Sequence, residues 1–148
     1  MIQLFSLSDL ESILQIENQS FPKSPYDWIT FLNLHYLYRE TFWVYINTSH
    51  GQKEEKILGY IIFSQDGHII SIAVHPHHRR KGIAKELLQR AMKASHLQRV
   101  WAEVRTSNQG AQAFYSKMGF RVTGMVPNYY GNEDALIIQW ISGTDDSY

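Results

Sequence analysis

A hairpin followed directly by a long amphipathic helix is the feature that most constrains the fold of this chain. Ile57–Ser64 and His68–Val74 are apolar, strand-like runs, and the Asp66-Gly67 pair between them is a strong signal for a tight hairpin turn. Ile83–Ser95 then carries apolar residues at every fourth position, which is the spacing of one helical face. This succession indicates a domain in which helices pack on a sheet.

The other segments extend this pattern to an α/β domain. β-Branched and aromatic residues predict further strands at Ile2–Phe5, Phe42–Ile46, Arg99–Arg105, Phe120–Met125 and Ala135–Ile141. Further helices are predicted from Ser8, from about Tyr26 with Trp28, Phe31, Leu32 and His35 on one side, and at Gln109–Met118. The order predicts an antiparallel meander and a later parallel crossover. We expect residues 1–142 to form a single domain and residues 143–148 a loose tail.

Composition excludes several classes of protein. The 148 residues include no cysteine, which rules out a disulfide framework, a thiolate zinc site and a cysteine nucleophile. The 14 Lys and Arg residues balance 14 Asp and Glu residues, so the basic excess typical of nucleic-acid-binding proteins is missing. No segment approaches the roughly 20 apolar residues that span a bilayer, and the N-terminus lacks the pattern of a signal peptide. We therefore expect a cytoplasmic protein that binds neither nucleic acid nor membrane.

The start of the helix near Gly82 breaks the usual rules for a helix N-terminus. Such a position favours a Ser, Thr, Asp or Asn cap and acidic residues, because the helix dipole is positive there. Here Arg79, Arg80 and Lys81 come directly before Gly82 instead. An anionic ligand would resolve the conflict, since phosphate oxygens accept hydrogen bonds from the free N–H groups and attract the cations. Charge runs are also common as solvated surface loops, and spacing alone leaves both interpretations open.

A histidine cluster precedes this helix start. His75, His77 and His78 raise the question of a metal site. No carboxylate or further histidine has a spacing in the sequence that would complete one, so the sequence predicts no metal site.

The pattern Arg79-x-x-Gly82-x-Ala84, after a strand ending at Val74, resembles the acetyl-CoA loop of the GNAT N-acetyltransferase superfamily, Arg/Gln-x-x-Gly-x-Gly/Ala. The resemblance implies that family's α/β fold, a central, mixed, mostly antiparallel twisted sheet with about four helices on both faces. It implies acetyl-CoA as co-substrate, its pyrophosphate held by backbone N–H groups and its pantetheine arm paired with the preceding strand. The implied cofactor contacts are Ile72, Ala73, Val74, Arg79, Arg80, Lys81, Gly82, Ile83, Ala84, Asn108 and Tyr115.

The second half resembles the bacterial RimI type within this superfamily, whose members acetylate the N-terminal alanine of a small-subunit ribosomal protein. Archaeal and eukaryotic protein N-terminal acetyltransferases share much of the pattern. The similarity covers nearly the whole chain, but His75 replaces an acidic residue often found there, and Tyr26–Lys56 matches poorly. It rests on Trp101–Asn108, Ala113–Phe120, Asn128-Tyr129-Tyr130 followed by Glu133-Asp134-Ala135, and Glu17 leading to Phe21-Pro22.

The same resemblance implies the catalytic groups. Glu103 matches the base that takes a proton from the acceptor amine, and Tyr115 matches the acid that meets the leaving thiolate. Simpler explanations exist for each residue. Glu103 could form a surface pair with Arg105, Tyr115 could be a core residue, and Asn108 could cap the following helix.

The acceptor is predicted to be a protein N-terminus, such as that of a ribosomal protein. An α-amine has a pKa of about 7.7–8.0, so roughly a tenth is neutral at pH 7, whereas a lysine with a pKa of about 10.4 is almost fully charged. One carboxylate acting through water therefore suits the α-amine better. Tyr129 and Tyr130 are candidates for lining the acceptor groove. A small amine or a lysine as acceptor, a non-catalytic acyl-CoA-binding module, and a monomer or weak dimer are the alternatives that stay open.

Overall fold

The computed structural model of the chain describes residues 1–49, 55–94 and 98–143. Part of the predicted loop Thr48–Lys56, the predicted helix end at Ser95 and residues 144–148 of the predicted tail lie outside this range. The elements follow one another as β1 (Ile2–Leu4), η1 (Leu7–Asp9), α1 (Leu10–Ser20), α2 (Trp28–Leu37), β2 (Phe42–Ile46), β3 (Ile57–Phe63), β4 (Ile69–Val74), η2 (Pro76–His78), α3 (Ile83–Ala94), β5 (Arg99–Arg105), α4 (Gln109–Lys117), β6 (Arg121–Val126) and β7 (Ala135–Ile141).

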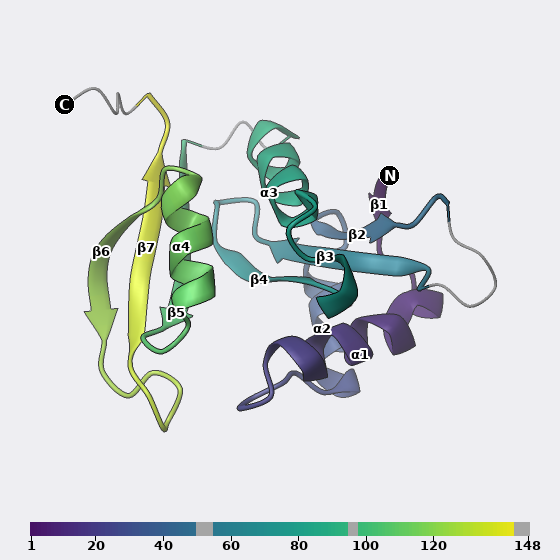
Figure 1. Ribbon diagram of the computed structural model, residues 1–148, viewed down its shortest axis with the longest axis horizontal. Coiled ribbons are helices and arrows are strands. Elements are labelled where there is room, and N and C mark those ends of the chain that lie inside the picture. The colour runs from purple at the N-terminus through teal and green to yellow at the C-terminus, as the bar shows by residue number, and fades with distance from the viewer. Residues whose placement is uncertain (50–54, 95–97, 144–148) are drawn as a thin grey trace.

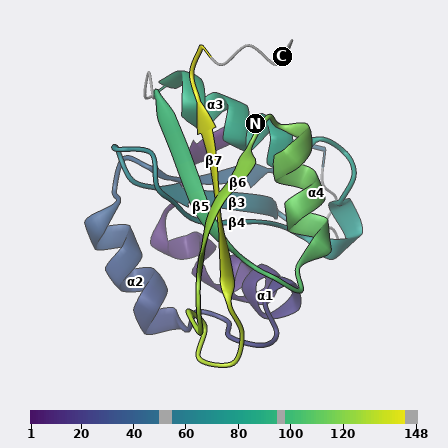
Figure 2. The same ribbon diagram turned by 90° about the vertical axis from the view of Figure 1, so that its left-hand side faces the viewer.

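The strands form two antiparallel groups that diverge from one another. One has the order β1-β2-β3-β4 and the other β5-β7-β6. Within the described ranges they meet at one parallel bridge, between His68 and Trp101, where the Trp101 N–H donates to the Gly67 carbonyl oxygen at 3.0 Å. A Cβ on Gly67 would collide with the Arg99 carbonyl, so this close approach requires glycine. The predicted parallel crossover is therefore β4–α3–β5, and the second group crosses in front of the first in Figure 2.

Helices cover both faces of the four-stranded group (Figure 1). On one face α3 packs on β3 and β4, and the core includes Leu87 and Leu88 together with Val104 of β5. On the other face α1 packs on β3 and β4, and the core includes Ile13 and Phe31. The sheet thus separates two hydrophobic cores, and this arrangement confirms the predicted fold. Among the described residues, no helix combines the length and the apolar character needed to cross a membrane.

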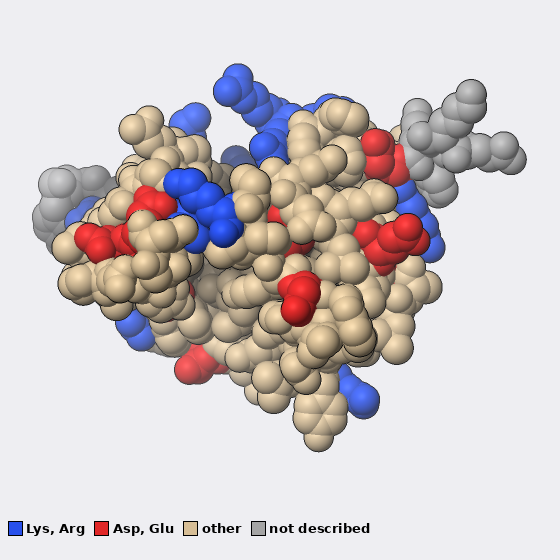
Figure 3. All heavy atoms as spheres, turned by 90° about the horizontal axis from the view of Figure 1, so that it is seen from below, with Lys and Arg blue, Asp and Glu red and all other residues tan. Residues whose placement is uncertain are grey.

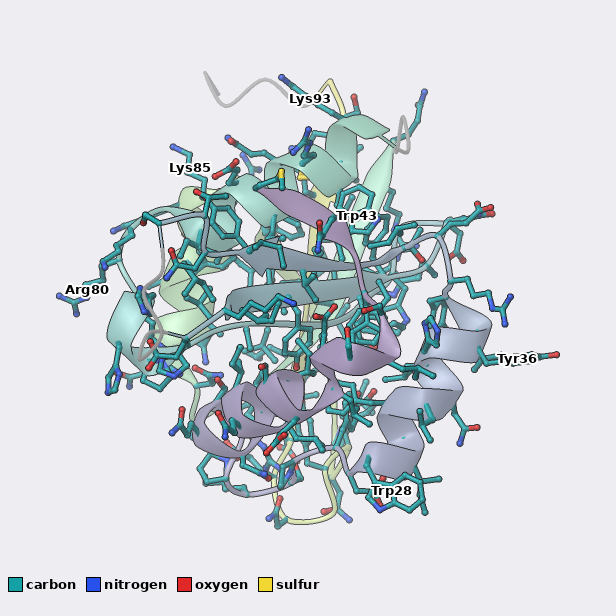
Figure 4. The ribbon with its side chains drawn as sticks, turned by 90° about the vertical axis from the view of Figure 1, so that its right-hand side faces the viewer. Trp28, Tyr36, Trp43, Arg80, Lys85 and Lys93 are labelled. Carbon is teal, nitrogen blue, oxygen red and sulfur yellow. The ribbon has the colours of Figure 1, made fainter. Side chains whose placement is uncertain are left out.

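Helix α2 differs from its prediction in one respect. It begins at Trp28, where Asp27 caps it by accepting a hydrogen bond from the Thr30 N–H at 2.8 Å. Phe31 is fully buried, whereas Trp28 is 55% exposed and points away from the body of the molecule, as does Tyr36 (Figure 4). The inward face of α2 is centred on Phe31, and Trp28 lies at its margin in the first turn. The predicted side of the helix is therefore buried at Phe31 and half-buried at Leu32 and His35, but exposed at Trp28.

Candidate functional site

The two groups of strands part along β4, which creates a free strand edge. Beyond His68, β4 pairs only with β3 among the described strands. The predicted cofactor contacts Ile72, Ala73 and Val74 lie on this stretch. A free strand edge offers N–H and C=O groups to an extended ligand that carries amide groups. The position of these three residues is therefore compatible with the predicted pairing to a pantetheine arm.

The loop that follows β4 presents free backbone donors. Gly82 has a φ of 80° and Arg80 a φ of 63°, and both values turn the chain sharply before α3 begins at Ile83. The Glu86 N–H is bonded to the Gly82 carbonyl at 3.0 Å, but no side chain of the described residues accepts from the first N–H groups of α3. Space above Gly82 is open, because a Cβ there would meet no atom within 4 Å. Free donors at a helix start with open space above them favour an anionic ligand, which is the arrangement that the sequence predicted.

The three cations near this loop have different surroundings. Arg79 donates from Nε to the Val74 carbonyl at 3.2 Å and from Nη2 to Ser20 Oγ at 3.1 Å, so it ties the end of β4 to α1. Arg80 extends into solvent (Figure 4). Lys81 Nζ lies 3.4 Å from His78 Nδ1. Of the three, Arg79 is engaged in holding the strand end rather than facing the open loop. Of the other predicted contacts, Ile83 is in the core and Ala84 is half-buried.

Glu103 lies on the side of β5 that does not face the core, next to His68. Its Oε2 is 2.7 Å from His68 Nε2, and its side chain is 17% exposed. The His68 ring stacks on the Trp101 ring at 5.2 Å and 4°, with the Arg99 guanidinium over Trp101 at 4.2 Å. Arg105 forms its ion pair with Glu133 at 3.1 Å. The predicted alternative of a surface pair between Glu103 and Arg105 is therefore wrong.

Tyr115 and Asn108 belong to α4. Tyr115 is 5% exposed and its ring contacts those of Phe114 and Phe120, so it is also a core residue. Burial, followed by the nearby Tyr130 and Glu103, raises the pKa of Tyr115, and its hydroxyl therefore stays protonated at neutral pH. Asn108 caps α4, its Oδ1 accepting from the Ala111 N–H at 3.1 Å. The capping interpretation of Asn108 is confirmed.

Two tyrosines that follow β6 contact one another. The Tyr129 and Tyr130 rings meet edge to face at 4.9 Å, and the Arg105 guanidinium lies 4.1 Å over the Tyr130 ring. Burial is the main cause that raises the pKa of Tyr130 to about 12. Burial, followed by the nearby Glu17 carboxylate and then by Tyr129 and Glu103, also raises the pKa of Tyr26. No pattern in the sequence predicted a role for Tyr26.

Glu133 connects three segments around these tyrosines. It accepts from the Ser107 N–H at 2.6 Å and from Arg105 at 3.1 Å, and Lys23 Nζ lies 3.5 Å away. Arg105 also donates to Ser24 Oγ at 2.6 Å. Hydrogen bonds from Ser107, and then from Arg105 and Thr106, lower the pKa of Glu133 to about 2.

Seen from below, a furrow runs between the part with β5–β7 and the part with α1 and α2 (Figure 3).

Buried Glu17 anchors the segment between α1 and α2. Its carboxylate accepts hydrogen bonds from the Tyr26 N–H at 3.0 Å and from the Tyr60 hydroxyl, which also contacts Ser71 Oγ at 2.9 Å. Burial is the main cause that raises the pKa of Glu17. This carboxylate therefore fixes the position of Tyr26 from inside the molecule.

The structure brings together residues that sequence spacing did not connect. The signal that connects His68 with Glu103 lies in the predicted topology. His68 starts the strand after the predicted hairpin turn, and the predicted crossover places the strand of Glu103 beside it. The sequence predicts no metal site because no carboxylate is suitably spaced along the chain from the histidines. In the fold, however, Glu55 lies 3.4 Å from both His75 and His77 and 3.2 Å from His78, so a carboxylate is present beside them.

Comparison with known proteins gives the family context of this geometry. The model of the acetyltransferase (GNAT) family matches residues 9–120. An uncharacterized N-acetyltransferase of Methanocaldococcus jannaschii is 34% identical, covering 93% of this chain and 88% of its own. An N-alpha-acetyltransferase of Sulfolobus acidocaldarius is 30% identical, covering 93% and 89%. A Bacillus subtilis protein provisionally assigned as ribosomal protein bS18-alanine N-acetyltransferase is 32% identical, covering 92% and 91%.

Solved structures agree in fold. Ard1 of Thermoplasma volcanium superposes with a TM-score of 0.84 at 31% identity, covering 95% of this chain and 96% of that one. Naa20 of Chaetomium thermophilum, solved with a bisubstrate analogue, gives 0.80 at 26% identity, covering 95% and 86%. The parting strands, the uncapped helix start and the furrow thus occur in a chain whose similarity to these proteins extends over almost its entire length.

Proposed function

The chain belongs to the GNAT acetyltransferase family, and from that premise we propose that it acetylates the N-terminal α-amine of a protein, of the ribosomal-protein alanine type or a broader relative. Enzymes of this family use acetyl-CoA as the acetyl donor. Relatives named N-alpha-acetyltransferase and ribosomal protein bS18-alanine N-acetyltransferase support a protein N-terminus as the acceptor.

The chain offers acetyl-CoA a suitable place. The first N–H groups of α3 and the open space above Gly82 suit the pyrophosphate, and the free edge of β4 at Ile72–Val74 suits the pantetheine amides. In this proposal the residues from Arg79 to Ala84 hold the phosphates, chiefly through their backbone. Asn108 lies at the start of α4, where its side chain caps the helix. In this proposal the same side chain also contacts the pantetheine arm. The bound thioester supplies the acetyl group.

Glu103 acts as the base in this proposal. Its carboxylate is partly exposed, so an acceptor amine can reach it directly or through one water. His68 is a positioning residue: its imidazole, donating from Nε2, orients the carboxylate, and stacking on Trp101 holds the ring. The α-amine needs little help to lose its proton, because its pKa of about 7.7–8.0 is close to neutral pH.

Tyr115 acts as the acid. Its raised pKa keeps the proton on the hydroxyl at neutral pH. Tyr115 therefore acts by donating a hydrogen bond that stabilises the negative charge on the thiolate as the C–S bond breaks. Tyr129 and Tyr130 line the path of the acceptor, and Tyr26 extends this lining from the segment before α2.

The observation that carries this proposal is the position of the His68–Glu103 contact, at the place where the two groups of strands part. Three peptides of one sequence test it with acetyl-CoA, by the rate of CoA release and the mass of the product. One has a free N-terminal alanine and no lysine, one a blocked N-terminus and a lysine, and one has both groups blocked.

Turnover of the first peptide alone is the expected result. Turnover of the second alone would contradict the proposal and identify a lysine acetyltransferase. If none of the three peptides is acetylated while acetyl-CoA still binds, the proposal is also contradicted. That result would favour a small amine as acceptor or a non-catalytic acyl-CoA-binding protein.

A further inference from the structure

A histidine-rich cluster lies at the far end of β4 from His68. Glu55 comes just before β3, and His75, His77 and His78 lie in and next to η2, directly after β4. Because β3 and β4 are antiparallel neighbours, the start of one lies beside the end of the other, and the His75 N–H donates to the Leu58 carbonyl at 2.7 Å. The fold therefore places the Glu55 carboxylate beside three imidazoles that lie about twenty residues further along the sequence.

The distances within this cluster match those between ligands of one metal ion. Glu55 Oε1 lies 3.4 Å from His75 Nε2 and 3.4 Å from His77 Nδ1, and all three ligand atoms lie within 4.8 Å of one another. In a tetrahedral zinc site with bonds of about 2.0–2.1 Å, neighbouring ligand atoms are about 3.3–3.4 Å apart. Small rotations of exposed side chains would complete the geometry, since His77 is 77% and Glu55 33% exposed.

His78 has a different place in the cluster. Its Nε2 lies 3.2 Å from the other carboxylate oxygen, Glu55 Oε2, and its Nδ1 faces Lys81 Nζ at 3.4 Å. The lysine donates to Nδ1, which leaves the His78 proton on Nε2, where it is donated to Glu55. A hydrogen bond of this kind orients a carboxylate whose other oxygen binds a metal.

We propose that Glu55, His75 and His77 bind a divalent transition-metal ion of the zinc type, with His78 orienting the carboxylate and water in the fourth position. Two imidazoles and one carboxylate suit zinc and its neighbours in the first transition row, whereas magnesium and calcium prefer oxygen ligands alone. One local change is needed, because the His75 ring must carry its proton on Nδ1. The 3.2 Å hydrogen bond from the His77 N–H to that atom is then given up.

The position of the site gives it a defined consequence. The η2 turn runs directly into the Arg79–Gly82 loop, so an ion here would link the start of β3 to the cofactor loop. Arg80, labelled in Figure 4, follows this turn. The three proposed ligands, Glu55, His75 and His77, are not among the residues proposed for acetyl transfer, and the test reads metal binding, so the two proposals can fail separately.

Zinc titration of the full-length chain, with any affinity tag removed and a chromophoric chelator as competitor, tests the proposal. We expect one saturable zinc per chain and at least tenfold weaker binding in Glu55→Gln and in His77→Ala. Both positions are exposed enough for the variants to fold, which circular dichroism checks. Glu11→Gln, an exposed acidic residue on α1, and His96→Ala, outside the described residues, are the matched controls and should bind as the unchanged chain does.

Cobalt substitution provides a second, independent readout. The expected result is the intense visible absorption of a four-coordinate cobalt ion, lost in His77→Ala. Zinc binding that is equal in all variants, absent from the unchanged chain, or accompanied by the weak spectrum of octahedral cobalt would overturn the proposal and leave a hydrogen-bonded cluster without an ion.

Discussion

The proposed cofactor side, at the start of α3, and the proposed acceptor side, around Glu133, differ in how their polar groups are satisfied. On the cofactor side, the chain turns through positive φ at Arg80 and Gly82, and no described side chain accepts from the first N–H groups of α3. On the acceptor side, Glu133 accepts several hydrogen bonds and Asp134 accepts from the Asn128 N–H at 2.7 Å. The proposed cofactor side thus keeps N–H donors that an anion can satisfy, whereas the carboxylates of the proposed acceptor side are already hydrogen-bonded within the chain.

Two glycines allow this difference to be tested with the same substitution. Gly82 on the cofactor side and Gly131 on the acceptor side both have a φ of 80° and open space around them. Alanine in the left-handed region costs roughly 1–2 kcal/mol, so both variants should lose similar stability. In Gly82→Ala the methyl group also enters the space assigned to the pyrophosphate. Acetyl-CoA binding, measured by calorimetry, should weaken about tenfold or more, in line with about 1.4 kcal/mol per factor of ten.

Gly131→Ala serves as the matched control for this measurement. Its acetyl-CoA affinity should stay within about twofold of the unchanged chain, and any kinetic effect should appear in the KM for the peptide. Equal losses of acetyl-CoA affinity in both variants would show that the effect is general strain and would remove the distinction between the two sides.

A smaller effect is expected from Glu133→Gln on the acceptor side. The variant weakens the contacts to Ser107, Arg105 and Lys23, which hold three segments together. Because the amide keeps the shape of the side chain but loses its charge, the peptide KM should rise about two- to fivefold while acetyl-CoA affinity is unchanged. A change in acetyl-CoA affinity with an unchanged peptide KM would reverse the assignment of sides.

The effect of Glu133 has a defined pH dependence. Its pKa of about 2 in the folded chain lies below the usual value, so its contribution is fully present above the unfolded pKa and is lost as pH falls through about 2. The peptide KM should therefore show no titration of this group between pH 5 and pH 8.

The two sides also differ in how far the sequence predicted them. The residues of the proposed cofactor side are contiguous in the sequence, because the segment from Val74 to Ala84 contains the strand end, the loop and the helix start. The motif and the missing helix cap could therefore be recognised from the sequence. The direction of the Arg79 side chain could not be predicted in this way, because one of its two partners, Ser20, belongs to the distant helix α1.

The acceptor side depends on contacts between distant segments. Glu133 reaches Lys23 across the chain, Tyr26 is placed by buried Glu17, and Glu103 meets His68 only because two strands approach at one bridge. None of these pairs leaves a pattern of spacing in the sequence. The same reason explains why Glu55 was not connected with His75.

The two sides meet at Glu103, so the most direct test of this account compares turnover and acetyl-CoA binding in Glu103→Gln, with Tyr115→Phe measured alongside. General acid–base catalysis typically contributes about 10²–10⁴-fold, so kcat on the alanine peptide should fall by that order in Glu103→Gln, with acetyl-CoA affinity unchanged. Turnover by both variants at the rate of the unchanged chain would contradict the account, because the proton transfers would then be carried by groups other than Glu103 and Tyr115.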